Sequence, residues 1–197
     1  MHNIVLTTGD VAKYCGVNFR TVIRWIEKGY LVAYRLPGRG DNRIKLEDFL
    51  GFLREYGMPI PEEFQELRRR VLVVEDDLAT SQLIVKALER NGFAASTARD
   101  GFEAGMMLGL VQPAVMTLDL AMGGLDGFAV IEQVRGNERA SACRILIVSG
   151  RPREDLDRAL ALGADEALAK PFEMSELLDA ISRLSGIDID EPVTVAV

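Results

Sequence analysis

The sequence predicts an α/β protein in which a doubly wound, five-stranded parallel sheet follows a small helical domain that carries a hairpin. Three observations lead to this prediction. Short apolar runs rich in β-branched residues recur after residue 70, and helical stretches separate them. Prolines and a glycine within residues 57–61 interrupt the chain before the first of these runs. Strands that alternate with helices form a parallel sheet covered by helices.

The first domain is expected to open with two helices joined by a tight turn. Thr7 and Asp10 fit a capping box for a helix that runs to about Tyr14. Asn18 can cap a second helix, which Gly29 closes at its C-terminal end. A hairpin is expected from residues 31–36 and 42–44, with a long tip at residues 37–41. A third helix is expected over residues 45–56.

The seam at residues 57–61 ends the third helix, because proline cannot continue it. Residues 62–70 then favour a short amphipathic helix that runs directly into a strand. The last residues have no helical period, which predicts a mobile tail. We therefore expect a first domain over residues 1–57 and a linker over residues 58–69. A second domain is expected over residues 70–186, followed by a tail over residues 187–197.

The second domain repeats a strand and a helix five times. Its first strand, Val71–Val74, is wholly apolar, as expected for a strand buried on both faces. The other strands are expected at residues 93–97, 114–118, 145–148 and 166–169, and the helices at about 79–91, 101–110, 126–135, 152–162 and 173–185. Right-handed crossovers then place helices on both faces of the sheet.

The chain has 197 residues and a formal net charge of −7, which is unevenly distributed. Residues 1–57 carry nine Lys/Arg and six Asp/Glu, whereas residues 71–197 carry eleven and twenty-one. A basic first part suggests a polyanionic partner for that part. No run of about 18 apolar residues is present, so no membrane span is expected. The start lacks signal-peptide features, and two isolated cysteines fit a reducing cytoplasm.

Acidic residues follow two strands of the predicted sheet. Glu75, Asp76 and Asp77 come directly after the first strand, and Asp119 ends the third. A strand order of 2-1-3-4-5 makes these strands neighbours, and ligands bind beyond the carboxyl ends of such strands. Crowded carboxylates repel one another unless a cation neutralises them. Oxygen ligands with room for water suit Mg²⁺.

Ser149 ends the fourth strand and Lys170 ends the fifth, which adds a hydroxyl and an ammonium to the same edge. This set suits phosphoryl chemistry, with Asp119 as the nucleophile that forms an acyl phosphate. Lys170 and Mg²⁺ would offset charge on the transferring oxygens, and Ser149 would hydrogen-bond one of them. Taken singly, the acids at 75–77 could lie in a solvated loop, Asp119 could be a turn residue and Lys170 a surface lysine. Their combination at the ends of neighbouring strands favours a phosphoryl-transfer site.

Residues 70–186 resemble a CheY-like receiver domain with a flavodoxin-like sheet. The matching stretches are residues 71–77, 118–120, 124–128, 147–150 and 163–172. The resemblance implies that Asp119 is the phosphoacceptor and that a histidine kinase or phosphotransfer protein is the donor. It implies direct Mg²⁺ ligation by Asp76 and Asp119, ligation by Glu75 through water and by the carbonyl of Ala121, and roles for Ser149 and Lys170 as the switch hydroxyl and the lysine of the site.

The sequence departs from the family pattern at two positions. Gly123 stands where the family usually has proline, which predicts a more mobile loop after the acceptor. Ala167 stands where the family usually has Tyr or Phe, so no aromatic ring can move together with the hydroxyl. The resemblance also implies a cis peptide bond between Lys170 and Pro171, which proline permits at little energetic cost.

The second helix of the first domain is expected to present two faces. Phe19, Val22 and Ile26 form an apolar stripe that is expected to bury this helix against the first one, with Trp25 beside them as a core anchor. A cationic stripe lies on another face at positions 20, 24 and 28. Arginine side chains can bind phosphate or read guanine. The alternative is a solvated basic face without a partner.

Residues 4–56 resemble an excisionase/MerR-type winged helix-turn-helix, through positions 8–12, 16–17, 21–25, 29–31 and 34–43. The resemblance implies that residues 18–28 are the recognition helix and that residues 35–43 form a wing over the phosphate backbone. Asp41 departs from the commonly more basic wing tip. The expected DNA-contacting residues are Asn18, Arg20, Thr21, Arg24, Lys28, Arg35, Arg39 and Arg43.

These features together predict a two-component response regulator whose DNA binding is controlled by phosphorylation and which pairs through its receiver. We expect it to act on no substrate beyond its own phosphoryl group. One alternative is a regulator whose helix-turn-helix contacts protein instead of DNA. Another is a haloacid-dehalogenase-like phosphatase, but Ala121 stands where that class has its second aspartate.

Overall fold

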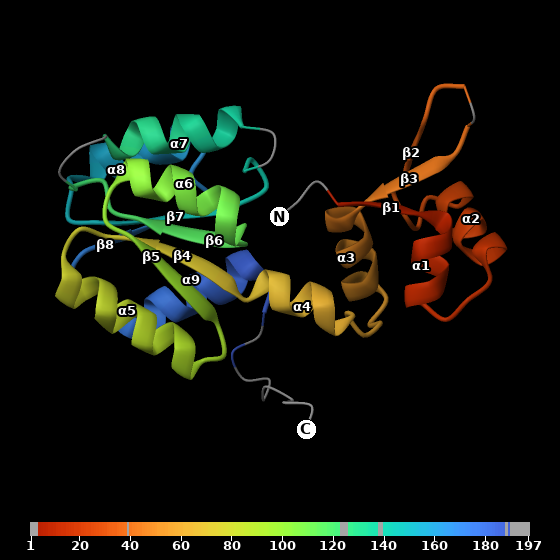
Figure 1. Cartoon of the computed structure of the whole chain (residues 1–197), viewed down its shortest axis with the longest axis horizontal. Helices are drawn as coiled ribbons and strands as arrows, with labels where there is room; N and C mark the ends of the chain where they lie inside the picture. The colour runs from red at the N-terminus through yellow and green to blue at the C-terminus, as the bar shows by residue number, and fades with distance from the viewer. Residues whose placement is uncertain (1–3, 39, 123–125, 138–139, 188, 190–197) are drawn as a thin grey trace. The chain divides into compact units, whose positions relative to one another are not determined.

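The computed structural model describes residues 4–38, 40–122, 126–137, 140–187 and 189, and the chain divides into two compact units. The first unit holds residues 3–64 and the second begins at residue 65. Figure 1 shows the two units, which are described separately below.

The first unit is a small helical domain with a three-stranded antiparallel sheet in the order β1-β3-β2. Its elements are β1 (Val5–Thr7), α1 (Thr8–Tyr14), α2 (Phe19–Glu27), β2 (Tyr34–Arg35), β3 (Asn42–Lys45) and α3 (Leu46–Glu55). The expected helix–turn–helix, hairpin and third helix are therefore confirmed. Strand β1 was not predicted, because three residues leading into a helix carry too little period to recognise.

The caps of α1 and α2 form as the sequence predicts. The Thr7 side chain accepts from the backbone N–H of Asp10, and the Asp10 carboxylate accepts from that of Thr7. The Asn18 side chain accepts from the backbone N–H of Arg20. These bonds satisfy N–H groups that a helix N-terminus otherwise leaves unpaired, so both helices begin at defined residues.

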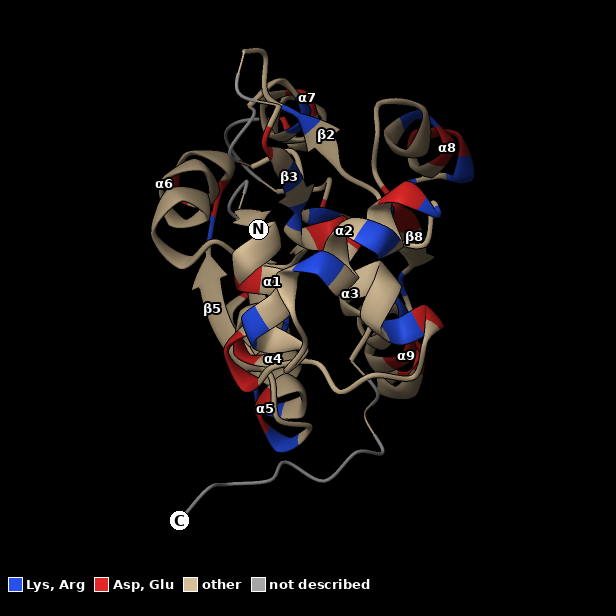
Figure 2. Cartoon of the chain, turned by 90° about the vertical axis from the view of Figure 1, so that its right-hand side faces the viewer, with Lys and Arg blue, Asp and Glu red and all other residues tan. Residues whose placement is uncertain are grey.

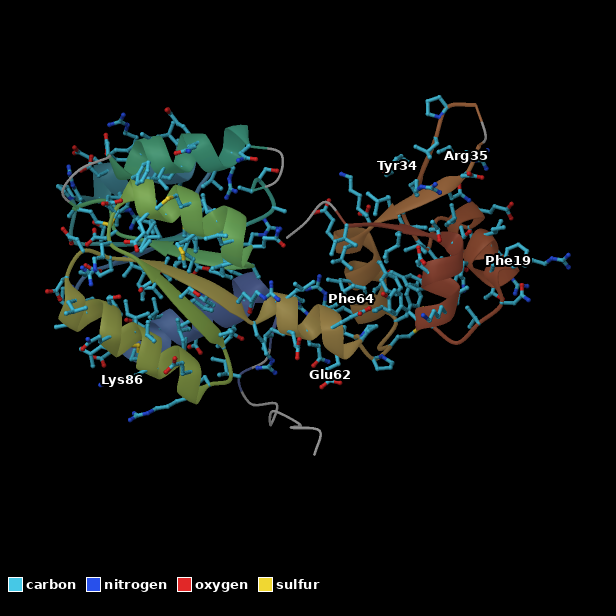
Figure 3. The ribbon with its side chains drawn as sticks, in the orientation of Figure 1. Phe19, Tyr34, Arg35, Glu62, Phe64 and Lys86 are labelled. Atoms are coloured by element: carbon cyan, nitrogen blue, oxygen red, sulfur yellow. The ribbon has the colours of Figure 1, made fainter. Side chains whose placement is uncertain are left out.

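Aromatic rings pack α3 against the elements around it. The Trp25 ring lies 5.0 Å from that of Phe52, which supports its expected place as a core anchor. The ring of Phe64 lies 4.9 Å from that of Tyr14 and 6.3 Å from that of Phe49. Phe64 belongs to α4 (Glu62–Arg68), the short helix expected after the seam, and is labelled in Figure 3.

The second unit is a doubly wound domain around a five-stranded parallel sheet in the order β5-β4-β6-β7-β8, as predicted. Its strands are β4 (Arg70–Val74), β5 (Ala94–Ala98), β6 (Val115–Leu118), β7 (Arg144–Ser149) and β8 (Glu166–Ala169). Its helices are α5 (Leu78–Arg90), α6 (Gly101–Val111), α7 (Gly127–Gly136), α8 (Arg153–Ala161) and α9 (Met174–Ser185).

Helices cover both faces of this sheet. Figure 1 shows α6, α7 and α8 on one face and α5 and α9 on the other. The two apolar cores match: Ala104, Ile131 and Leu156 belong to one, and Ile84 and Ile181 to the other. β4, β6 and β7 are buried between the cores, which explains why their sequences are continuous apolar runs instead of alternating ones.

Arg68, the last residue of α4, is buried in the second unit, with 2% of its surface exposed. Its Nε donates to the carbonyl of Ser185 at 2.7 Å, and its Nη2 donates to the carbonyl of Gly186. These carbonyls end α9, where helix carbonyls lack partners and the helix dipole is negative. The helix end therefore balances the buried guanidinium charge.

Candidate phosphoacceptor site and nucleic-acid interface

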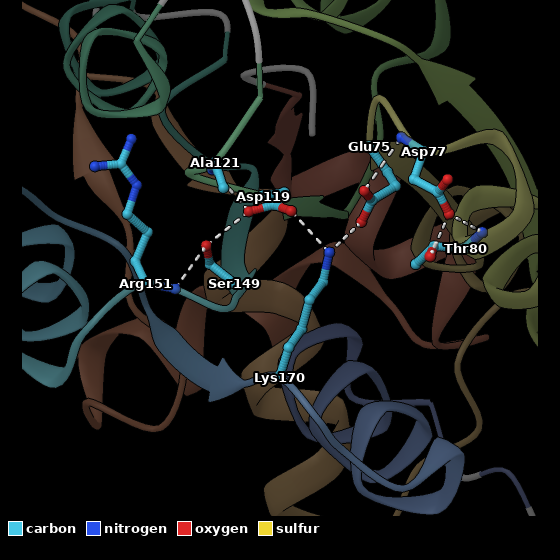
Figure 4. Close-up of polar contacts among 8 residues, drawn as sticks. All are labelled: Glu75, Asp77, Thr80, Asp119, Ala121, Ser149, Arg151 and Lys170. Atoms are coloured by element: carbon cyan, nitrogen blue, oxygen red, sulfur yellow. Dashed lines mark hydrogen bonds and ion pairs between the residues drawn. The ribbon is translucent and has the colours of Figure 1, made fainter.

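The expected site residues meet at one edge of the parallel sheet (Figure 4). Glu75 follows β4, Asp119 follows β6, Ser149 is the last residue of β7, and Lys170 follows β8. Because these strands are parallel and adjacent, their carboxyl ends lie at the same edge. The topology thus brings together four residues from distant parts of the sequence.

Lys170 joins the two carboxylates of the site. Its Nζ lies 2.7 Å from Oε2 of Glu75 and 2.7 Å from Oδ2 of Asp119. The other oxygen of Asp119 accepts from the Ser149 hydroxyl at 2.6 Å and from the Ala121 backbone N–H at 2.8 Å. Glu75, Asp119 and Ser149 are all buried, so these contacts lie largely out of bulk water.

The surroundings move the pKa values of the two carboxyls in opposite directions. Burial raises the pKa of Glu75 by more than its bond with Lys170 lowers it. Burial also raises the pKa of Asp119, but hydrogen bonds from Lys170, Ser149 and Ala121 outweigh it, so the net pKa lies below the ordinary value. Burial lowers the pKa of Lys170, and its bonds with both carboxylates raise it overall. Asp119 is therefore an ionised carboxylate beside an ammonium.

The three acids after β4 have separate surroundings. Glu75 points into the site, Asp76 is exposed beside it, and Asp77 caps α5 by accepting from the backbone N–H of Thr80 at 2.8 Å. That hydrogen bond lowers the pKa of Asp77. A hollow opens from Glu75 and Asp76 along α5 towards the end of β5.

A metal ion is expected at this site from Glu75, Asp76, Asp119 and the carbonyl of Ala121. Among the residues that the structure describes, no cluster of three or more His, Cys, Asp or Glu side chains is arranged to hold one. Lys170 lies between the carboxylates of Glu75 and Asp119. The carboxylate oxygens of Glu75 and Asp119 already bind the positive charge of the Lys170 ammonium. Such hard oxygen donors fit the ligand chemistry of Mg²⁺.

The surroundings of the site include the departures from the family pattern. Ala167 is half-buried beside Ile147 of β7 and packs against the core of that sheet face, and its own side chain carries no ring. Gly123 lies outside the described residues. The Lys170–Pro171 peptide bond is cis, as expected.

Two backbone groups contribute to the site without a signal in the sequence. The N–H of Ala121 bonds the acceptor carboxylate, and the N–H of Arg151 donates to the Ser149 hydroxyl oxygen at 3.4 Å. Any residue except proline can supply such a group.

Gly127 begins α7 close against the acceptor strand. A Cβ atom at this position would lie 3.0 Å from Cα of Leu120 and 3.3 Å from the carbonyl oxygen of Asp119. No side chain fits there without moving backbone, so the close approach of α7 to the acceptor loop requires glycine.

The candidate recognition helix α2 presents its basic residues to solvent. Arg20, Arg24 and Lys28 are all exposed, and Figure 2 shows the charged positions along the chain. Asn18 is exposed and caps the helix, and Thr21 is half-buried. The opposite side packs through buried Val22 and half-buried Ile26.

One residue of the expected apolar stripe lies outside the core. Phe19 is 49% exposed, so the prediction that it is buried against α1 is wrong. It occupies the first position of α2, where the helix has no turn before it to bring the ring over α1, and Figure 3 shows its side chain.

The hairpin presents part of the expected wing. Arg35 is exposed on β2, and Arg43 is half-buried on β3 and donates to the carbonyl of Asn42. Asp41 is exposed at the tip. Arg39 lies outside the described residues.

The sheet order and the acid–hydroxyl–lysine site define a receiver domain of the kind found in response regulators. The family model of the response regulator receiver domain matches residues 71–182, more than half of the chain, and the chain belongs to this family. A helix-turn-helix domain model matches residues 5–57. The MerR subtype expected for this domain remains a prediction.

Several known proteins are similar to the chain. The transcriptional regulatory protein TctD of Salmonella typhimurium is 35% identical over 126 residues, which cover 62% of this chain and 55% of TctD. The response regulator MprA of Mycobacterium tuberculosis is 37% identical over 110 residues, 55% of this chain and 47% of MprA. A receiver-domain crystal structure from Bermanella marisrubri is 44% identical with a TM-score of 0.56, covering 59% of this chain and 97% of that chain.

The matched region spans about half the length of these curated relatives. In the parts of the chain that the structure describes, no helix is long and apolar enough to cross a membrane.

Proposed function

We propose that this protein is a two-component response regulator whose DNA binding is controlled by phosphorylation of Asp119. The observation that supports this most is the position of Lys170, whose ammonium holds Asp119 and Glu75 at one sheet edge. The donor is a histidine kinase or a phosphotransfer protein. The site residues of this chain are those expected from the sequence: Asp119 accepts the phosphoryl group, and Ser149 and Lys170 contact that group.

The reaction begins with the ionised carboxylate of Asp119, whose lowered pKa keeps it deprotonated at neutral pH. One carboxylate oxygen attacks the phosphorus, a new O–P bond forms, and the P–N bond of phosphohistidine breaks with its electron pair returning to the imidazole. The Lys170 ammonium offsets charge on the phosphoryl oxygens. Ser149 then exchanges its bond with Asp119 for one with a phosphoryl oxygen.

Glu75, Asp76, Asp119 and the carbonyl of Ala121 would hold Mg²⁺. Bound there, the ion would neutralise charge on the transferring group. The chain's own residues still supply the nucleophile and orient the acceptor. Hydrolysis completes the chemistry: water attacks the phosphorus, the O–P bond to Asp119 breaks with its electron pair returning to the carboxylate, and inorganic phosphate leaves. No other substrate is turned over.

The first unit supplies the output. Arg20, Arg24 and Lys28 form an exposed basic stripe on a helix with well-defined caps, which suits insertion into a DNA groove. The helix-turn-helix match and the transcriptional names of the relatives favour DNA over a protein partner. We place the protein in the cytoplasm, where DNA and the phosphodonor meet.

Pairing of receivers is the proposed link between the two units. One small module offers few DNA contacts, whereas two linked modules gain about 10²–10⁴ in avidity. Phosphorylation would favour the paired form and so raise DNA affinity.

Capture of genomic DNA fragments by wild type and Asp119→Asn, each with and without a small acyl-phosphate donor and Mg²⁺, tests the proposal. We expect a set of fragments enriched only by donor-treated wild type, with retention that falls steeply with salt. Retention of the same fragments by all four samples would reject control through Asp119. No salt-dependent retention in any sample would reject DNA as the partner.

A further inference from the structure

Helix α6 is apolar on the side that faces away from its own domain. Its inner residues, Ala104, Met107 and Leu108, pack against the core. Phe102, Met106 and Leu110 are 72%, 52% and 78% exposed. Their spacing of four residues places them in one row along the helix. A helix that is apolar all round is normally buried on all sides, but no described element of its own unit covers this row.

The outer face of α6 is also free of charge. The helix contains one charged residue, Glu103, whose carboxylate accepts from the Arg99 backbone N–H at 2.8 Å and is half-buried. Residues 71–197 otherwise carry a large excess of acids over bases. Two copies of such a domain repel one another across most faces, and α6 is a face where that repulsion is weak.

The shape of the face complements itself. Gly105 and Gly109 form a second row beside Phe102, Met106 and Leu110. A Cβ on Gly109 would meet nothing within 4 Å, and one on Gly105 would lie 3.6 Å from the end of the Gln133 side chain, so the groove is open at Gly109 and bordered by Gln133 at Gly105. The large side chains form a ridge and the glycine row a groove, both along the i, i+4 direction. Ridges of this direction pack into grooves of the same direction on a second helix. A two-fold contact needs both surfaces on one molecule, which α6 supplies.

We propose that a second copy of this chain docks on α6, so that the row Phe102–Met106–Leu110 of each copy packs beside the glycine row of the other. The proposal deepens the receiver pairing of the proposed function by assigning its surface. A contact made by one helix of each copy is expected to fall in the class below about 1,200 Å² that includes transient interfaces, so we expect a weak dimer that forms only at high protein concentration.

Sedimentation of the full chain over a concentration series tests the contact without DNA or phosphodonor. Leu110→Glu places a charge in the ridge, and Leu83→Glu is the matched control, because Leu83 is 63% exposed on α5. We expect wild type and Leu83→Glu to dimerise with similar constants and Leu110→Glu to weaken dimerisation at least tenfold. Equal constants for the three proteins, or a monomeric wild type throughout, would overturn the proposal.

Disulfide trapping locates the symmetry axis. Met106 is the middle residue of the ridge, so a two-fold axis that passes through the centre of the contact places Met106 next to its own copy. In a Cys15→Ser background, where the remaining Cys143 is buried, Met106→Cys is expected to form disulfide-linked dimers much faster than Leu83→Cys. Equal rates would place the contact elsewhere. DNA capture tests the proposed function separately. The α6 contact can therefore fail while DNA binding controlled by Asp119 stands, and the reverse is also possible.

Discussion

The Ser149 hydroxyl donates a 2.6 Å hydrogen bond to Oδ1 of Asp119. The side chain expected to contact a phosphoryl group is therefore already bound to the acceptor carboxylate before the group arrives. Because Ala167 carries no ring that could move with the hydroxyl, we expect the exchange of this hydrogen bond to be the main local change around Ser149 on phosphorylation.

Ser149→Ala is expected to accept phosphate on Asp119 but to lose the increase in DNA affinity that phosphorylation gives. The alanine has no hydroxyl to move from the carboxylate to a phosphoryl oxygen, whereas Ser149→Thr keeps one and should respond. Phosphoprotein mass spectrometry and DNA titration measure the two effects separately. A full DNA response in phosphorylated Ser149→Ala would contradict the role given to this hydroxyl.

Asp119 is expected to be the residue labelled by an acyl-phosphate donor with Mg²⁺. Asp119→Asn should remain unlabelled, because its amide is not a nucleophile of comparable strength. The control is Asp126→Asn, a change to an exposed residue whose side chain caps α7 and whose asparagine can still accept that bond. Intact-protein mass should rise for wild type and Asp126→Asn alone. An equally labelled Asp119→Asn protein would reject the acceptor assignment.

Arg24→Ala is expected to weaken DNA binding, whereas Lys86→Ala, an exposed change on α5 of the receiver, should not. Loss of a phosphate contact would lower the slope of log affinity against log salt by about 0.9. Loss of a base contact would cost about 1–3 kcal/mol and relax sequence preference. Titrations at several salt concentrations distinguish these results. Wild-type affinity for every sequence in Arg24→Ala would show that α2 is not the recognition helix.

Arg68→Gln is expected to lower the free energy of unfolding by about 3 kcal/mol, because it removes charge-assisted bonds to the buried carbonyls that end α9. Arg90→Gln, an exposed change at the end of α5, should stay within about 0.5 kcal/mol of wild type. Urea unfolding followed by circular dichroism compares them. Similar stabilities would show that the guanidinium contributes little beyond its packing.

The parallel sheet and its site could be predicted because their signals are local and repeated. Each central strand is an apolar run, and each site residue lies at a strand end, so the topology alone brings Glu75, Asp119 and Lys170 together. The hydrogen bonds of Ala121 and Arg151 could not be predicted, since backbone groups leave no trace in residue type.

The burial of side chains was harder to predict where a helix begins or lies on the surface. Phe19 fits an apolar stripe by spacing, but its place in the first turn leaves it in solvent. The residues of α6 are apolar at nearly every position, so their spacing does not show which of them face the core, and only the structure separates the inner row from the outer one. The carbonyls of Ser185 and Gly186, to which Arg68 donates, lie more than a hundred residues away, beyond any local pattern.

Gly127 brings the start of α7 directly against the backbone of Asp119 and Leu120. A Cβ built on Gly127 would lie only 3.0 Å from Cα of Leu120, so the start of α7 and Leu120 are in tight backbone contact. A displacement of Leu120 would therefore be transmitted to the start of α7, because tightly packed interiors transmit strain. Because Gly127 has no side chain, it allows this close backbone contact between α7 and Leu120.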